Sequence, residues 1–348
     1  MRLYVGTYSS ADSAGIHRLR FDERRGTFEY EAGYAGVEQP SYVLPNASGT
    51  ALYAASETND GKVAAFAIEP GSGALRPLNV RSTGGGAPCH LALSRDGRLL
   101  FAANYAGGSV AVVPLEADGS LAERSELRVH EGRGARADRQ EAPHPHSANV
   151  DPSGRYVVVP DLGIDRLVMY AIEGNGLRRM AETALPAGTG PRHLAFHPTL
   201  PAAYVAGELD NTVTVLAVED EPFALAATQR VATLPDTFEG ESTSADIHVT
   251  PDGSLLFVSN RGHDSLAAYR VDAADGRLTP IGFFPSGGRT PRNFAISPDG
   301  AFLIAANQQS DALVAFRIDP ETGALEETAR HEGISKPVCI RFVTTNGV

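Results

Sequence analysis

A unit of about 50 residues recurs along the chain, and this repeat constrains the fold more than any other feature. Each copy contains a short apolar strand, a turn rich in Pro, Asp, Ser and Gly, and a second apolar strand that ends in polar residues. The clearest copies are PCHLALSRDGRLLFAANYAGGSVAVV from Pro88 and PRNFAISPDGAFLIAANQQSDALVAF from Pro291. The other copies begin at Pro40, His146, Pro191 and Ala245, and the strand PVCIRFV begins a seventh at Pro337.

The repeat predicts an all-β, seven-bladed β-propeller with four-stranded antiparallel blades, formed by residues 1–348 as a single domain. The seventh unit contains only one strand, whereas three strands, at residues 3–8, 15–22 and 27–34, precede the first unit. We therefore expect the C-terminal strand to pair with the N-terminal strands. This pairing would complete one blade, close the ring and protect its sheet edges.

Composition excludes several classes of partner. The net charge of −12 gives an acidic surface that repels phosphate backbones and anionic lipids, so we expect neither a nucleic-acid nor a membrane partner. The N-terminus MRLYVGTYSS lacks the apolar segment of a signal peptide, and no run approaches the ~18 apolar residues of a membrane span. We expect a cytoplasmic monomer or weak homo-oligomer, with Cys89 and Cys339 as buried, reduced thiols.

Polar residues gather at one end of the predicted strands. In a propeller the first strand of each blade lies nearest the axis, so the loops before first strands and the loops after second strands share one rim. The candidate residues before first strands are His90, His144, His146, Arg192, His193, Asp246 and Arg292. Those after second strands are Tyr105, Glu208, Arg261 and Asn307. The turns at the opposite ends carry mainly turn chemistry, so a functional site is expected on the first rim.

An insertion at residues 130–142 directly precedes His144 and His146. Its arginines, Arg133, Arg136 and Arg139, suit a lid that brings positive charge to the site. A solvated surface excursion explains the insertion equally well.

The residue types on the predicted rim suit the binding and turnover of a small anion. Arginine side chains bind carboxylate or phosphate and stabilise a developing oxyanion, and a histidine or glutamate can transfer the proton. No GxSxG elbow, P-loop or GxGxxG motif is present. A zinc site built from His144, His146 and His193 is a less favoured alternative, and we expect neither a metal nor a cofactor.

The chain resembles the lactonase seven-bladed propeller family, which includes propeller-type 6-phosphogluconolactonases and fungal carboxymuconate lactonising enzymes. The most specific matches are RQEAPHPHS (139–147) and SNRGHDS (259–265), with support from VGTYSS, GPRHLAFHP and GELDNTV. In the lactonising members the proposed site combines a histidine, two arginines and a glutamate. By motif, the resemblance implies catalytic roles for His146, Arg192, Glu208 and Arg261. Substrate contacts are expected from His90, Tyr105, His144, His193, Asp246, Arg292 and Asn307.

The leading hypothesis is therefore hydrolysis of a small anionic sugar lactone, 6-phosphogluconolactone, to the open acid in the pentose phosphate pathway. Either Glu208 or His146 would be the general base, and the sequence leaves both open. One alternative is a cycloisomerase that closes a muconate-type dicarboxylate to a lactone. Another is a non-catalytic interaction platform, which would expose a broad apolar patch.

Overall fold

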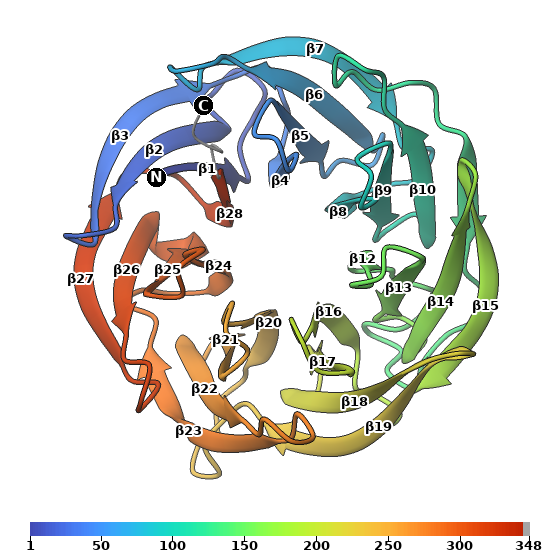
Figure 1. Cartoon of the computed structure of the whole chain (residues 1–348), viewed down its shortest axis with the longest axis vertical. Coiled ribbons are helices and arrows are strands. Elements are labelled where there is room, and N and C mark those ends of the chain that lie inside the picture. The colour runs from blue at the N-terminus through green and yellow to red at the C-terminus, as the bar shows by residue number, and fades with distance from the viewer. Residues whose placement is uncertain (344–348) are drawn as a thin grey trace.

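The computed structural model describes residues 1–343 and forms a ring of seven four-stranded antiparallel sheets around a common axis (Figure 1). The predicted seven-bladed propeller is confirmed. Blade 1 contains β28 (Pro337–Val343), β1 (Arg2–Thr7), β2 (Ile16–Asp22) and β3 (Thr27–Tyr34). Blade 2 contains β4 (Pro40–Pro45), β5 (Ala51–Ser56), β6 (Lys62–Ile68) and β7 (Leu75–Ser82). Blade 3 contains β8 (Pro88–Leu93), β9 (Leu99–Asn104), β10 (Ser109–Pro114) and β11 (Glu126–Val129).

The remaining blades follow the same order from the axis outward. Blade 4 contains β12 (Asn149–Val150), β13 (Tyr156–Asp161), β14 (Arg166–Glu173) and β15 (Gly176–Ala184). Blade 5 contains β16 (Pro191–Phe196), β17 (Ala202–Gly207), β18 (Thr212–Asp220) and β19 (Phe223–Ala232). Blade 6 contains β20 (Thr243–Val249), β21 (Leu255–Arg261), β22 (Ser265–Val271) and β23 (Leu278–Pro285). Blade 7 contains β24 (Pro291–Ile296), β25 (Phe302–Asn307), the short 3-10 helix η1 (Gln308–Ser310), β26 (Ala312–Ile318) and β27 (Leu325–Glu332).

The ring closes where β28 pairs antiparallel with β1. Leu3 lies opposite Phe342, and Val5 lies opposite Ile340. The last described strand therefore completes the blade that the first three strands begin, and Figure 1 shows β28 beside β1 in that blade. The predicted closure is confirmed, because the inner strand of blade 1 follows blade 7 in the chain and pairs with the first strand, which protects both sheet edges.

The middle strands of each blade are packed between neighbouring sheets, which explains their continuous apolar runs. All six residues of β9 are buried, whereas in the outer strand β7 only the first residue, Leu75, is buried and the others are intermediate or exposed. Aromatic contacts join adjacent blades. The rings of Phe21 and Phe302 meet edge to face at 5.2 Å. Hydrogen bonds also join adjacent blades. In three blade pairs a buried tyrosine hydroxyl donates to a glycine carbonyl in the next blade, as Tyr204 does to Gly276 at 2.9 Å.

Most inner strands have a shift in pairing register at their N-terminal end, on the rim of the candidate site. This shift directs side chains toward the axis. The pairing of β16 with β17 shifts between Pro191 and Leu194, and equivalent shifts occur at the starts of β4, β8, β20 and β24. Such bulges re-aim side chains and are common beside functional sites. The residue before the proline also has positive φ in several blades, including Ala87 and Thr290. Consecutive residues of one inner strand, such as Arg192 and His193, can therefore both face the axis.

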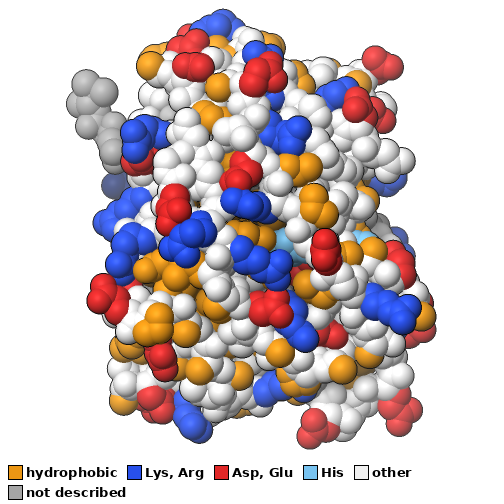
Figure 2. All heavy atoms as spheres, turned by 90° about the vertical axis from the view of Figure 1, so that its right-hand side faces the viewer, with side chains coloured by type: hydrophobic (Ala, Val, Ile, Leu, Met, Phe, Trp, Pro, Cys, Tyr) orange, Lys and Arg blue, Asp and Glu red, His pale blue; other side chains and the backbone are white. Residues whose placement is uncertain are grey.

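Acidic and basic side chains are interspersed on the outside of the ring, as the face that carries β14 and β15 shows (Figure 2). Among residues 1–343, the exposed large hydrophobic side chains are Tyr30, Val80 and Val129, which lie on the outer strands of three different blades. The described surface therefore lacks a broad apolar patch of the kind that an interaction platform would present.

Candidate active site

Glu208 is a buried carboxylate on the rim where the candidate residues were predicted, and several arginine side chains contact it. It directly follows β17 and is 3% exposed. Its Oε2 atom lies 2.9 Å from Nε of Arg192 and 3.0 Å from Nη2 of Arg261. Neither N–H is aligned for a hydrogen bond to Oε2, so these two contacts are ion pairs without a hydrogen bond. Nε of both arginines therefore has no hydrogen-bond acceptor among the described residues. Three of the four predicted catalytic residues thus meet at one point.

The insertion brings a third guanidinium to this carboxylate. Nη2 of Arg139 donates to Oε1 of Glu208 at 2.7 Å. Burial would lower the pKa of Arg139, but the nearby Glu208 and Tyr105 outweigh it and raise the pKa above its ordinary value. Arg136 instead pairs with the exposed Asp138 at 3.1 Å. The segment 130–142 therefore lies partly on the surface and partly against the site. Arg139 contacts Glu208, although the motifs did not identify it as a catalytic residue.

The charges within the cluster control each other's ionisation. Burial alone would raise the pKa of Glu208, but the guanidiniums of Arg261, Arg192 and Arg139 hold it well below its usual range. Burial lowers the pKa of Arg261 to about 10, even though Glu208 opposes this shift. At neutral pH, Glu208 is therefore a fixed anion that positions cations, and it has little tendency to take up a proton.

His146 faces the same cluster and is neutral. It lies just before β12, held by a hydrogen bond from its backbone N–H to the carbonyl of Pro160 at 2.9 Å. Its Nε2 is 3.8 Å from Oε2 of Glu208, and its Nδ1 is 3.6 Å from Sγ of Cys89. Burial, and then the charge of Arg192, keep the pKa of His146 well below 6.5. His146 is thus an uncharged imidazole beside an ionised carboxylate.

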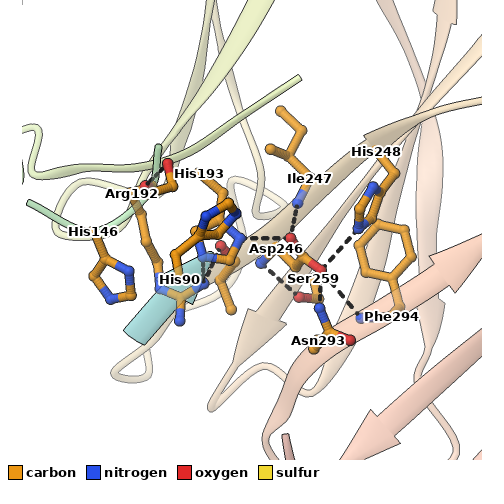
Figure 3. Close-up of polar contacts among 12 residues, drawn as sticks. His90, His146, Arg192, His193, Asp246, Ile247, His248, Ser259, Asn293 and Phe294 are labelled. Atoms are coloured by element: carbon orange, nitrogen blue, oxygen red, sulfur yellow. Dashed lines mark hydrogen bonds and ion pairs between the residues drawn. The ribbon is translucent and has the colours of Figure 1, made fainter. Parts of the chain in front are cut away.

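A chain of polar contacts runs from Arg192 through His193 and Asp246 to His248 (Figure 3). Nη1 of Arg192 donates to the carbonyl of Ala245 at 2.7 Å and lies 3.3 Å from Nε2 of His193. Nδ1 of His193 lies 2.6 Å from Oδ1 of Asp246, whose Oδ2 is 2.9 Å from Nε2 of His248. Because Asp246 accepts the Nδ1 proton of His193, Nε2 of His193 is free to accept from Arg192. His193, oriented by Asp246, therefore helps to fix the position of the Arg192 guanidinium.

A further cation, Arg292, lies on the inner strand β24 of blade 7. The side chain of Arg292 is half-buried, and its nearest carboxylate, Glu57, is 4.0 Å from its Nη2. The guanidinium stacks over the ring of Tyr8 at 5.3 Å, and the Tyr8 hydroxyl donates to the carboxylate of Glu57 at 2.9 and 3.0 Å. Arg292 electrostatically lowers the pKa values of Arg192 and His146, where burial is the largest cause. Arg292 therefore belongs to the same charged cluster. Among the four arginines of the cluster, it lies farthest from its nearest carboxylate.

The other residues that were predicted to contact substrate lie at different depths along the propeller axis. Tyr105 lies beside His146, with ring centroids 5.3 Å apart, and stacks on His144 at 4.4 Å. His144 bonds through Nδ1 to the carbonyl of Tyr105 at 3.0 Å. His90 lies deeper and contacts Tyr42. These roles stay predictions, although the placement of His144 suits support of Tyr105 and His146.

Asn307 has a different environment from the one expected of a substrate contact. It has no exposed surface and donates through Nδ2 to the carbonyl of Ser286 at 2.9 Å. Asn104, the last residue of β9, and Asn260, the next-to-last residue of β21, hold the corresponding positions in blades 3 and 6, and both are also fully buried with bonded side-chain amides. The recurring asparagine therefore anchors loops within the blades.

A cavity of about 770 Å³ opens on this rim beside the cluster. Arg139 and Arg261, which both contact Glu208, line it, together with Arg136, Gly240 and Thr290. The loop before β20 and the insertion at 130–142 thus flank one opening. The cavity is large enough for a sugar-sized ligand.

The loop that carries His144 and His146 depends on a glycine. A Cβ atom at Gly163 would lie 1.9 Å from the carbonyl oxygen of Ala142 and 2.7 Å from the backbone nitrogen of His144. Gly163→Ala is therefore expected to displace this loop, to lower the stability by about 1–3 kcal/mol and to reduce turnover. Urea unfolding and rate measurements test this. Gly282→Ala, whose Cβ would meet nothing closer than 3.9 Å, should change neither, and equal behaviour of the two variants would contradict the prediction.

Asp246→Asn tests whether Asp246 positions Arg192 through His193. An asparagine cannot hold the Nδ1 proton of His193 as a carboxylate does, so Nε2 would no longer be fixed as an acceptor for Arg192. We expect kcat to fall about 10–100-fold. The ¹⁵N chemical shifts of His193 should report a changed tautomer in the same variant. A loss of stability with unchanged shifts and unchanged kcat would reduce Asp246 to a purely structural residue.

The fold and this cluster together define a seven-bladed propeller with a buried arginine–glutamate–histidine centre at one rim. The chain belongs to the lactonase seven-bladed β-propeller family, because residues 2–342 match that family, described as "Lactonase, 7-bladed beta-propeller". It is 37% identical over 341 residues to the 6-phosphogluconolactonase of Bacillus subtilis, covering 98% of this chain and 97% of the relative. The resemblance inferred from the motifs is confirmed.

Solved structures agree with this assignment. The periplasmic gluconolactonase PpgL of Pseudomonas aeruginosa superposes with a TM-score of 0.92 at 34% identity, covering 99% of both chains. A protein from Lactobacillus plantarum superposes with the same TM-score at 30% identity, again covering 99% of both chains.

Two further observations concern metals and membranes. Within residues 1–343, no three His, Cys, Asp or Glu side chains are grouped as metal ligands would be. In the same part of the chain, no helix has the length and apolar character needed to cross a bilayer.

Proposed function

We propose that this protein hydrolyses 6-phosphogluconolactone to 6-phosphogluconate. The broader class, a hydrolase that acts on lactones, is the one to which the named relatives belong. The names of the relatives differ on one point, because the Bacillus protein is named for the phosphorylated lactone and the Pseudomonas protein for a gluconolactone. The choice between these substrates therefore depends on the charge of the site.

The observation that carries the proposal is the excess of positive charge in the cluster. Four guanidiniums, those of Arg139, Arg192, Arg261 and Arg292, are gathered around two carboxylates, Glu208 and Glu57. Two positive charges are thus left for a ligand to neutralise, and buried charge without a partner is costly. A phosphate monoester carries about −1.5 to −2 at neutral pH, whereas gluconolactone itself is neutral. The phosphorylated lactone supplies the matching charge.

In the proposed reaction, water attacks the carbonyl carbon of the lactone. Nε2 of His146 removes a proton from the water as the new C–O bond forms, and the carbonyl oxygen becomes an oxyanion. The unaligned N–H groups of Arg192 and Arg261 stabilise this oxyanion. The tetrahedral intermediate then breaks the bond to the ring oxygen, and the imidazolium returns its proton to that oxygen. Glu208 stabilises the transient imidazolium and keeps both arginines in place.

The direct test compares hydrolysis of fresh 6-phosphogluconolactone and of glucono-δ-lactone in a pH-stat. We expect kcat/KM to be at least about 100-fold higher for the phosphorylated substrate, the gain that a charge-assisted phosphate contact provides. A higher rate with the unphosphorylated lactone would support the second candidate, a gluconolactonase. If only ultraviolet loss of carboxymuconate is observed, the protein is instead a cycloisomerase.

Arg292 is assigned to the phosphate, because it is the cation farthest from direct neutralisation. Arg292→Met is therefore expected to raise KM for 6-phosphogluconolactone about tenfold or more and to leave KM for glucono-δ-lactone nearly unchanged. Steady-state kinetics with both substrates check this expectation. Equal losses on the two substrates would place Arg292 at the reacting ester.

The cellular setting stays a proposal. We retain a cytoplasmic location, where sugar phosphates are produced and consumed, although the name of the Pseudomonas relative places that protein in the periplasm. Cell fractionation tests the location. A monomeric or weakly associated state is likewise proposed, and light scattering tests it.

A further inference from the structure

A second cavity, of about 420 Å³, opens at the opposite rim of the propeller from Glu208. Pro198 and Pro251, in the turns after β16 and β20, line its outer part. Tyr42 and His90 line it together with Arg341, which lies near the C-terminal end of β28. The tight turns of this rim are structural, but the inner strands bring an unusual set of polar groups between them.

The Tyr42 hydroxyl has a proton that no described acceptor receives. The backbone N–H of Ala148 donates to Nδ1 of His90 at 3.3 Å, so the ring proton of neutral His90 lies on Nε2. Nε2 of His90 therefore donates to the Tyr42 oxygen at 2.8 Å, and Nη2 of Arg341 donates to the same oxygen. With two donors already on its oxygen, Tyr42 must direct its own proton elsewhere, and no acceptor for it occurs among residues 1–343. Tyr42 is 5% exposed and lines the cavity.

Arg341 adds a positive charge that no nearby carboxylate neutralises. Among the described residues, no acidic oxygen lies within 4.0 Å of its guanidinium, which donates to the carbonyl of Ile340 at 2.8 Å and stacks on Tyr42 at 4.7 Å. Asp246 lines the same cavity, but its oxygens already accept from five donors. These donors are the rings of His193 and His248, the amide of Asn293, and the backbone N–H groups of Ile247 and Phe294 (Figure 3). Tyr42 and Arg341 together thus offer hydrogen bonds to an anion.

Two acceptors complete the lining. Asn149 donates through Nδ2 to Ser147 at 2.9 Å and to the carbonyl of Val158 at 3.2 Å, so its Oδ1 is left to accept. His248 is bonded through Nε2 to Asp246, its Nδ1 has no hydrogen-bond partner among the described residues, and its side chain is 31% exposed. Acceptors of this kind bind hydroxyl groups and do not bind a second anionic group.

We propose that this cavity is a second ligand site, which binds a small hydroxycarboxylic acid. The carboxylate accepts hydrogen bonds from Tyr42 and Arg341, and hydroxyl groups of the ligand donate to Asn149 and His248. Ala195, which also lines the cavity, leaves room for the carbon chain between these two ends. His193 and Asp246 line this cavity and also support Arg192. The proposal still does not depend on the activity assigned to the other rim, because none of its four ligand contacts, Tyr42, Arg341, Asn149 and His248, belongs to the cluster around Glu208.

Isothermal titration calorimetry of the full-length protein with D-gluconate, acetate and D-glucose tests this site. Gluconate contains both the carboxylate and the hydroxyls, so it should bind at least about tenfold more tightly than either partial mimic. Equal binding of acetate would show that Asn149 and His248 contribute nothing, and equal binding of glucose would show that Arg341 contributes nothing. Either result would overturn the proposal.

The variant Tyr42→Phe distinguishes this cavity from the Glu208 cluster. It removes only the hydroxyl, and we expect gluconate affinity at the second site to fall about tenfold. Tyr53→Phe is the matched control, because Tyr53 is an equally buried tyrosine whose hydroxyl donates to Gly119 outside the cavity. A crystal soaked with gluconate should place the carboxylate against Arg341. Unchanged affinity in Tyr42→Phe, or ligand density only beside Glu208, would refute the second site.

Discussion

Glu208→Gln is expected to lower kcat/KM for lactone hydrolysis about 10³-fold and to destabilise the folded protein by about 3 kcal/mol. The amide keeps the shape of the side chain but removes the charge that holds Arg192, Arg261 and Arg139 together. The mutual repulsion of these guanidiniums would then displace the two arginines assigned to the oxyanion. Both effects arise from the same loss of charge, so they should appear together.

The stability effect has a defined pH dependence. In the folded protein burial would raise the pKa of Glu208, but the guanidiniums of Arg261, Arg192 and Arg139 outweigh burial and lower it well below the value of about 4.3 in an unfolded chain. The stabilisation by Glu208 is therefore complete above that value and is lost as the pH falls toward the folded pKa. The difference in unfolding free energy between wild type and Glu208→Gln should be constant from pH 6 to 8 and should narrow below about pH 4.

The matched control for this experiment is Asp210→Asn. Asp210 follows Glu208 by two residues in the same turn and pairs with Arg230, outside the cluster. Its replacement should leave kcat/KM close to the wild-type value. Urea unfolding at several pH values and pH-stat rates on folded protein measure both quantities. If Glu208→Gln retained wild-type turnover, Glu208 would be a structural ion-pair partner only.

The repeat in the sequence was sufficient to predict the ring and its closure. The single strand after Pro337 and the three strands before Pro40 could be matched by counting, and β28 does pair with β1. The meeting of Arg192, Glu208 and Arg261 was also predictable, because each lies at the rim end of an inner or second strand. Strand geometry thus determines which residues share a rim.

Depth along the axis could not be predicted in the same way. Arg192 and His193 are neighbours in sequence, and only the bulge at the start of β16 shows that Arg192 reaches Glu208 while His193 turns to Asp246. The contribution of Arg139 was equally hidden, because the path of a long insertion depends on what it packs against. A signal was available for Asn307, however. An asparagine at the same strand end in three blades, with Asn104 and Asn260, is better explained by the shared fold than by a substrate.

The two candidates for the general base differ in charge, which the sequence could not show. Glu208 is held ionised by three guanidiniums, so it has a low affinity for a proton. His146 is neutral and has its Nε2 within 3.8 Å of Glu208. If the ring proton lies on Nδ1, toward the sulfur of Cys89, the lone pair of Nε2 faces the cluster. We therefore assign the proton transfer to His146.

His146→Gln is accordingly expected to lower kcat about 10³-fold, within the range typical of a lost general base. Because burial and then Arg192 depress the pKa of His146, the wild-type enzyme should keep its neutral base at pH values below 6.5. The acid limb of the kcat/KM profile should therefore lie below pH 6.5, and it should disappear from the residual activity of His146→Gln. Initial rates between pH 4.5 and 8, corrected for uncatalysed hydrolysis, test both expectations.

His263→Gln serves as the control on the same rim, because Nδ1 of His263 bonds to Ser265 at 2.7 Å and its ring packs on Phe238. This variant should keep the wild-type profile. If His146→Gln instead retained the acid limb with only a small loss of rate, the proton would have to move through another group. Glu208 would then be the remaining candidate, and substrate binding would have to weaken its contacts with the arginines enough to raise its pKa.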